Sequence, residues 1–235
     1  MSLPLAFART RPATAPDGAL ATSVGSERVV LYAERALGWP HERTLFVADV
    51  HLGKGAAFRA GGVPIPRGST ASDLARLTRL LERSGATRLV VLGDFLHAKA
   101  GRVAALTHAF VTWRAQHAAL DVVLVRGNHD ARAGDPPQAW RIATVDEPYA
   151  LPPFLACHRV ETPPTGYALC GHIHPGVRID AAGESARLPC FVLGARRAIL
   201  PAFGRFTGLA DIAPADGERI VVIAGGALFE LPARA

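Results

Sequence analysis

Short apolar runs alternate with polar segments along the chain, and their length and β-branched content are typical of strands. Each run is bounded by glycine, proline or polar residues. The pattern predicts eight strands, at residues 29–33, 44–50, 88–94, 121–127, 154–158, 167–171, 187–194 and 219–225.

Two longer segments have the spacing of amphipathic helices. Residues 69–85 place four leucines on one face, with Ser69 or Thr70 as the N-cap and Gly85 as the stop signal. Residues 103–119 form the second candidate. Strand and helix alternate in the first half, whereas the second half is mostly strand, so we expect parallel pairing early and antiparallel pairing late. An α/β fold of two packed sheets with helices outside satisfies both halves.

The first residues of the chain have the composition of a tail. Residues 1–25 mix proline, alanine, threonine and glycine and predict a tail or an edge strand, followed by a single domain over residues 26–235. The start is a poor signal peptide, and no run reaches the roughly 20 apolar residues of a membrane span.

The three cysteines, Cys157, Cys170 and Cys190, lack CxxC spacing. This favours small buried side chains in a reducing cytoplasm over a disulfide framework.

Metal-capable side chains stand at the ends of five predicted strands. They are Asp49 and His51, then Asp94 with His97 shortly after, then Asn128, His129 and Asp130, then His158, and finally His172 and His174. Ligands gather at the carboxyl ends of strands in open α/β sheets. Gly93, Gly127 and Gly171 precede candidates and permit tight turns. In extended backbone, the D-x-H and H-x-H pairs would each project to one side.

The donor types indicate which metals this site would take. Aspartate, asparagine and histidine suit divalent Mn, Fe or Zn, and thiolate is missing from the set. Any one of these motifs alone is weak, but five in order at strand ends indicate a metal site. Asp94 is the natural bridge between two ions, and two ions about 3.5–4 Å apart form a clamp for in-line phosphoryl displacement.

The order D-x-H, G-D, G-N-H-D, H and G-H-x-H resembles the calcineurin-like metallophosphoesterases. The resemblance implies a four-layer double β-sandwich flanked by helices, with a two-metal site at one end. It implies that Asp49, His51 and His174 hold one metal, that Asp94 bridges, and that Asn128, His158 and His172 hold the other. His129 would act at the phosphate, and Asp130 would orient its imidazole. Many relatives carry an acid a few residues after G-D, where GDFLH has His97, which we expect to line the substrate groove.

Several longer stretches narrow the resemblance. FVADVHLGKGAAFRAGGVPIPRG, LVVLGDFLH, RGNHD, LCGHIHPGV, LPCFVLG and LPAFGRFTG span roughly residues 44–208. Together they resemble the ligase-associated DNA damage response branch of this superfamily. That resemblance implies a Mn-dependent phosphodiesterase or nuclease acting on DNA, with a DNA ligase and other repair enzymes as partners.

The charge balance agrees with a polyanionic partner. Twenty-six Lys and Arg face twenty Asp and Glu, and Lys54 and Lys99 are the only lysines. Arginine suits bidentate phosphate contacts, and a basic balance fits nucleic acid, although solvated surface arginines would give the same count. A basic rim is predicted from Lys54, Arg59, Arg67, Arg126, Arg132, Arg196, Arg197 and Arg205, of which Lys54, Arg59 and Arg126 are the preferred substrate contacts.

Two other functions remain open at this point. A phosphomonoesterase or small-molecule phosphodiesterase of the same fold would share every ligand. A non-enzymatic scaffold is expected to lose a ligand or His129, and none is missing here. Edge strands of a double sandwich also allow a homodimer.

Overall fold

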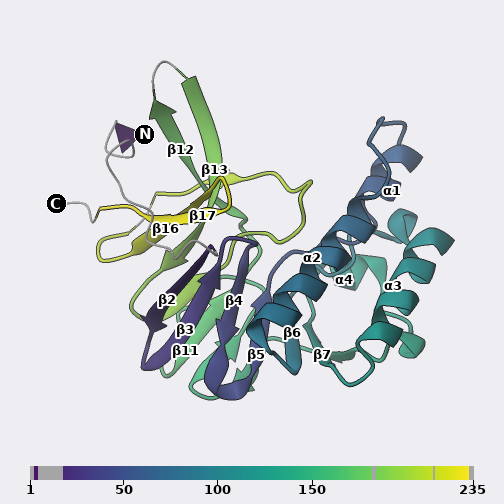
Figure 1. Cartoon of the computed structure of the whole chain (residues 1–235), viewed down its shortest axis with the longest axis horizontal. Coiled ribbons are helices and arrows are strands. Elements are labelled where there is room, and N and C mark those ends of the chain that lie inside the picture. Colours follow the sequence, from purple (N-terminus) through teal and green to yellow (C-terminus); the bar gives the residue numbers. More distant parts are fainter. Residues whose placement is uncertain (1–2, 5–17, 182–183, 214, 233–235) are drawn as a thin grey trace.

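Two large β-sheets pack face to face, with helices along one side of the pair (Figure 1). The structure is a computed structural model, and it describes residues 3–4, 18–181, 184–213 and 215–232. The predicted N-terminal tail lies largely outside these residues. Within its range, residues 19–24 form an edge strand of the first sheet.

The first sheet has seven strands, and its strand pairing changes from antiparallel to parallel at β5 (Thr44–Val47). Its strands, in spatial order, are β2 (Ala19–Val24), β3 (Glu27–Tyr32), β4 (Ala36–Trp39), β5 (Thr44–Val47), β6 (Arg88–Leu92), β7 (Asp121–Val125) and β8 (Ala143–Val145). Pairing is antiparallel from β2 to β5 and parallel from β5 to β8. Val47 pairs with Val91 and Val91 with Leu124, so the carboxyl ends of β5, β6 and β7 are level.

The second sheet has ten strands. They are β1 (Leu3–Pro4), β9 (Tyr149–Leu151), β10 (Phe154–Ala156), β11 (Tyr167–Cys170), β12 (Pro175–Ala181), β13 (Glu184–Leu193), β14 (Arg197–Ile199), β15 (Ala210–Asp211), β16 (Arg219–Ala224) and β17 (Ala227–Glu230). The expectation of antiparallel pairing in the second half is only partly right. The strands β10, β11 and β14 run parallel to one another, inside a sheet that is otherwise largely antiparallel.

In the described part of the chain, four α-helices lie in the connections that follow strands of the first sheet. They are α1 (Lys54–Ala60), α2 (Ser69–Ser84), α3 (Ala104–Gln116) and α4 (Asn128–Ala133), with short 3-10 turns at Pro40–Glu42, Lys99–Gly101 and Gln138–Trp140. The predicted helices correspond to α2 and α3, but the N-cap of α2 is Gly68 rather than Ser69 or Thr70. The helix α1 lies directly after the first motif, and α4 begins at Asn128, where the sequence predicts a tight turn.

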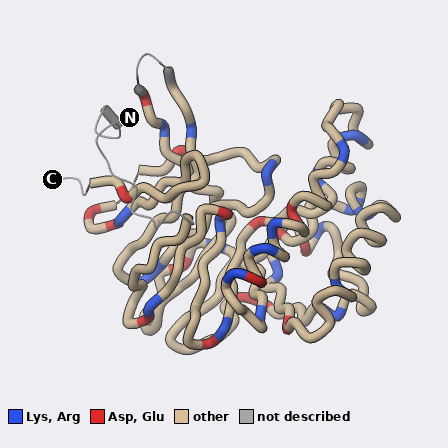
Figure 2. Tube along the Cα trace, viewed as in Figure 1, with Lys and Arg blue, Asp and Glu red and all other residues tan. Residues whose placement is uncertain are grey.

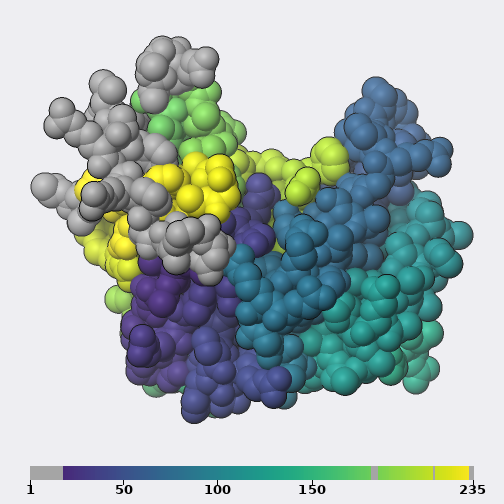
Figure 3. All heavy atoms as spheres, in the orientation of Figure 1, coloured from purple at the N-terminus to yellow at the C-terminus, as the bar shows by residue number. Residues whose placement is uncertain are grey.

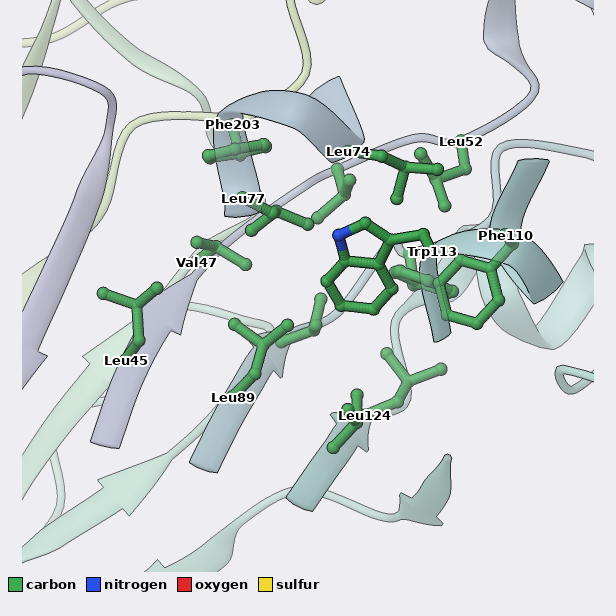
Figure 4. Close-up of a cluster of buried hydrophobic side chains, with 14 of the residues drawn as sticks. Leu45, Val47, Leu52, Leu74, Leu77, Leu89, Phe110, Trp113, Leu124 and Phe203 are labelled. Atoms are coloured by element: carbon green, nitrogen blue, oxygen red, sulfur yellow. The ribbon is translucent and has the colours of Figure 1, made fainter. Parts of the chain in front are cut away.

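Apolar side chains form a layer on each face of the two sheets. One cluster packs α2 and α3 onto the first sheet through residues such as Leu45, Leu77, Phe110 and Trp113 (Figure 4). A second cluster, with Phe46, Phe154 and Phe191, fills the space between the sheets. Burial of this scale supplies the main driving force for folding.

The outer face of the second sheet is covered differently from the first. Its cluster includes Cys157, Cys170 and Cys190, and Val160, Ile173 and Ile212 from connecting segments pack onto it. Among the described residues, no helix contributes to this cluster, so the predicted flanking helices lie on one side of the sandwich. All three cysteines are free and buried. No helix in the described part of the chain is long and apolar enough to cross a membrane.

Candidate metal centre

The predicted ligands come from both sheets and meet at one edge of the sandwich. Asp49 and His51 follow β5, Asp94 follows β6 and Asn128 follows β7, while His158 follows β10 and His172 and His174 follow β11. A parallel bridge between Ala48 and Ala202 joins the first sheet to the chain after β14. The carboxyl ends of the parallel strands of both sheets therefore point to the same place, as the strand-end pattern predicts.

The ligands form two groups. Within each group, the donor atoms lie within 4.8 Å of one another. Asp49, His51 and His174 form the first group, and Asp94, His158 and His172 form the second. In the first, His174 Nε2 is 3.4 Å from both His51 Nε2 and Asp49 Oδ1. In the second, His158 Nε2 is 3.0 Å from both Asn128 Oδ1 and His172 Nδ1.

Asp94 lies between the two groups. Its Oδ1 is 3.5 Å from His158 Nε2, and its Oδ2 is 3.9 Å from His51 Nε2. The same Oδ1 accepts a hydrogen bond of 2.8 Å from the backbone N–H of His129. One carboxylate thus contacts both groups and also fixes the start of α4.

The electrostatics of the centre favour a cation. Asp49 is fully buried and Asp94 is 2% exposed, and Oδ1 of Asp49 has no hydrogen-bond partner in the described structure. Burial raises the pKa of Asp94, although nearby imidazoles and a backbone hydrogen bond oppose the rise. Two buried carboxylates with an unsatisfied oxygen are costly unless a positive charge is bound. The oxygen and imidazole donors present suit divalent Mn, Fe or Zn.

Backbone carbonyls fix the protonation of two imidazoles. The Nδ1 atom of His158 lies 3.1 Å from the carbonyl of Leu92, and that of His174 lies 3.3 Å from the carbonyl of Gly208. A carbonyl only accepts, so Nδ1 carries the proton in each ring and the Nε2 lone pair faces the centre. Burial, together with the charge of Lys54, lowers the pKa of His51 to about 2, which keeps this ring neutral.

The backbone at the centre is unusual. Of the eight non-glycine residues with positive φ in the described chain, five are predicted ligands: Asp49, His51, Asp94, His172 and His174. Positive φ is disfavoured for residues with a Cβ and persists only where the surroundings enforce it. The expectation that D-x-H and H-x-H lie in extended backbone is therefore wrong, and His172 and His174 point to different groups.

The three glycines act through close approach more than through turns. Only Gly93 has positive φ, and a Cβ there would lie 2.1 Å from His158 Nδ1. A Cβ at Gly127 would lie 2.3 Å from Asp94 Oδ1, and one at Gly171 would lie 2.9 Å from Asp49 Oδ2. Each glycine makes room for a ligand carried by a different strand.

Asp130 does not contact the imidazole of His129, which corrects its predicted role. Its buried carboxylate accepts hydrogen bonds from the backbone N–H groups of Phe95, Leu96 and Gly127. It therefore ties the segment after β6 to the start of α4, because a short turn has no backbone partners of its own for these N–H groups.

His97 orients His129 instead. His129 Nδ1 donates to the carbonyl of His97 over 2.8 Å, and the two rings stack with centroids 4.9 Å apart. Nε2 of His129 lies 3.9 Å from Asp94 Oδ2 and so faces the centre. His97 Nδ1 is also 3.4 Å from His51 Nδ1, so His97 lies against two functional rings.

The predicted substrate contacts differ in their surroundings. Lys54 begins α1, and burial lowers its pKa against the opposing effect of the Asp94 and Asp49 carboxylates. Arg59 donates to the backbone carbonyls of Ile65 and Pro66. Arg126 is held by Asp135 and Asp146, so its charge is already neutralised, contrary to its predicted role.

Two features of the centre escaped the sequence reasoning. Glu147 accepts hydrogen bonds from the backbone N–H groups of His158 and Arg159 and so positions His158. The segment around Phe203 and Gly204 donates to the carbonyls of Ala48 and Asp49 and so holds the first motif. Only the segment around Phe203 and Gly204 could have been recognised from the sequence, because it belongs to the stretch LPAFGRFTG.

Comparison with known proteins agrees with this geometry. The model of the calcineurin-like phosphoesterase family matches residues 42–175. This chain belongs to that family. It is a metal-dependent phosphoesterase, and the resemblance drawn from the motif order is confirmed.

Solved structures extend the comparison beyond the family match. The nuclease MPE of Pseudomonas putida is 41% identical and has a TM-score of 0.79, with 91% of this chain and 100% of that chain covered. Yfce, a phosphoesterase from E. coli, is 16% identical with a TM-score of 0.38 over 79% of this chain and 90% of its own. Among curated proteins, no sequence matches this chain. A nuclease at 41% identity is what the narrower resemblance predicts.

Proposed function

We propose that this chain is a two-metal phosphodiesterase that cleaves DNA, with Mn as its metal and nucleic-acid repair as its setting. The observation that carries the proposal is the position of Asp94 between two groups of ligands, one 3.5 Å and the other 3.9 Å from its oxygens. The 41% identity with a nuclease supports phosphodiesters as substrates, and the net charge of +6 supports a polyanion.

The residues present would divide the work between binding and proton transfer. Asp49, His51 and His174 would hold one ion, Asn128, His158 and His172 the other, and Asp94 both. When bound, a pair of ions polarises the phosphate and lowers the pKa of a bound water. In its imidazolium form, His129 would hold a proton at Nε2 for the leaving oxygen, since Nδ1 is committed to the carbonyl of His97.

Cleavage of two DNA substrates side by side tests the proposal. One is linear and end-labelled, the other is a closed single-stranded circle, and each is incubated with Mn²⁺ and either the native protein or His129→Ala. We expect the native protein to cut DNA and the variant to be slower by about a hundredfold or more while keeping its metals. If neither DNA is cut but a small phosphoester is hydrolysed, the DNA proposal fails and the alternative of a small-molecule phosphoesterase stands.

DNA ligase and other repair enzymes are the partners we propose with this activity, on the resemblance of residues 44–208 to the ligase-associated branch. A pull-down with the purified ligase would test physical contact separately from catalysis. Cleavage without association would separate this partner proposal from the nuclease proposal.

A further inference from the structure

The basic side chains of the described surface fall into two classes. Some are neutralised by an acid, as Arg88 is by Asp121, Arg126 by Asp135 and Arg197 by Glu218. Lys54 and Arg205 have no acidic partner within 4 Å in the described part of the chain. An unpaired cation is available to bind a phosphate, whereas a paired one must first give up its partner.

These two cations share one pocket beside the metal centre. The pocket is lined by His51, Lys54, Ser69, Asp73, Arg205 and Phe206, among others. The carboxylate of Asp73 also lines the pocket, 3.1 Å from Arg76. It interacts with Arg76, Arg205 and Arg35 together, so it offsets only part of the positive charge of Lys54 and Arg205. Because His51 belongs to both the pocket and the first ligand group, a phosphate bound here would neighbour one held at the metals.

Phe206 adds an aromatic face to this pocket. It is 39% exposed and is the one aromatic among the large hydrophobic side chains exposed on the described surface. Its loop is anchored: Gly204 donates to the carbonyl of Asp49, and Arg35 and Thr207 donate to the carbonyl of Gly204. An exposed aromatic ring on an anchored loop has little packing role and is suited to stacking.

The surrounding surface leaves room for a nucleic-acid strand. The space-filling view shows a hollow between α1 and the strands β12 and β13, with the yellow-green segment that includes residues 200–209 at its floor (Figure 3). Lys and Arg are present on α1 and on that segment (Figure 2). The pocket therefore opens on a hollow with positive charge on its wall and its floor.

We propose that Lys54, Arg205 and Phe206 form a nucleotide subsite next to the metal centre. The two cations bind the phosphate adjacent to the one being cleaved, and Phe206 stacks on the base that this phosphate carries. The subsite rests on the proposed function, because it assumes a nucleic-acid substrate. In this proposal Arg205 contacts the substrate, and Arg126, which the sequence favoured, does not.

Oligonucleotide binding tests the stacking part of the subsite. The probe is a labelled single-stranded oligonucleotide, since only an unpaired base can stack, and a matched abasic strand is its comparison. Binding is measured by fluorescence anisotropy on Mn-loaded protein with His129→Ala, which slows cleavage. We expect Phe206→Leu to weaken binding of the normal strand about tenfold and Phe206→Trp to preserve it, with little effect of either on the abasic strand.

Salt dependence tests the phosphate part. Arg205→Gln in the same background is expected to reduce the slope of log K against log[salt] by about 0.7, the value for one phosphate contact on a single strand. The matched control is Arg88→Gln, an exposed arginine at the amino end of β6, which should leave the slope unchanged. Metal content and melting temperature, measured on each variant, separate loss of binding from loss of folding.

The possible results separate a failure of the subsite proposal from a failure of the proposed nuclease function. If the native protein cleaves DNA while Phe206→Leu and Arg205→Gln bind like their parent, the subsite is wrong and the nuclease function stands. If the native protein neither binds nor cleaves DNA, both are overturned.

Discussion

The two sheets contribute to the metal centre in different ways. The seven-stranded sheet supplies both carboxylates, Asp49 and Asp94, at the ends of adjacent parallel strands. The ten-stranded sheet supplies only imidazoles, from His158, His172 and His174, after the parallel strands β10 and β11. The strands β10 and β11, which run parallel to each other and to β14, direct these ligands to one edge of a mixed sheet. Neither sheet alone provides a complete site, and the buried negative charge belongs to one of them.

The largest effect is expected at Asp94, where the two contributions meet. Asp94→Asn removes the charge that contacts both ligand groups, so metal content should fall and turnover should drop by more than about a hundredfold. Metal analysis and Mn-dependent hydrolysis of a small phosphodiester check this. The control is Asp121→Asn, an exposed aspartate at the start of β7. Full activity with intact metal content would contradict the bridging role.

Removing one imidazole from each sheet separates the two ligand groups. His51→Ala should lose the ion of the first group and keep the second, and His158→Ala should do the reverse. We expect each variant to retain about one ion where the native protein holds two, with activity lowered by about a hundredfold. Metal stoichiometry after dialysis measures this, with the exposed His41→Ala as the control. Equal metal content in all four proteins would show that these rings are not ligands.

A smaller effect, on stability rather than chemistry, is expected at Asp130. Asp130→Ala leaves three buried backbone N–H groups without an acceptor and should lower the free energy of unfolding by about 2–3 kcal/mol. Urea denaturation with enzyme assays below the transition tests it. Unchanged stability with slowed catalysis would instead restore the role in orienting His129 that the sequence predicts.

The smallest effect is a pH dependence of the metal-free protein. Burial, aided by the charge of Lys54, lowers the pKa of His97 to about 4 from an unfolded value near 6.5. Between these values the unfolded chain binds more protons, so the stability that is full above pH 6.5 is lost as the pH falls towards 4. The melting temperature in EDTA should decline over this range, and less steeply in His97→Asn. Equal slopes in both proteins would remove His97 as a contributor.

The two sheets also differ in how well the sequence predicts them. The strands β5, β6 and β7 are long apolar runs followed by helices, so both their direction and their ligands were predictable. The short strands β9, β14 and β15 carry little periodicity, and the parallel pairing of β10 with β11 depends on contacts that no local pattern encodes. The helix α1 has only seven residues, so it is too short to show a clear helical pattern in the sequence.

The sequence predicts which residues belong to the metal centre better than it predicts what each of them does there. The motif order brought the correct residues together, but Asp130 bonds to Phe95 and Leu96, more than thirty residues away. The backbone conformation at Asp49 and His51 is left-handed without glycine, and such conformations are imposed by tertiary contacts rather than by residue preference. Glu147 also acts through the backbone of another segment, since its partners His158 and Arg159 lie eleven and twelve residues away.

Anomalous diffraction from crystals grown with Mn²⁺ tests the central claim most directly, because it locates the ions without reference to activity. Two peaks about 3.5–4 Å apart are predicted, one contacting Asp49, His51 and His174, the other contacting Asn128, His158 and His172, and both contacting Asp94. A single peak, or a peak held by the His51, His97 and His129 rings that also lie within 4.8 Å of one another, would contradict a two-metal centre shared between the sheets.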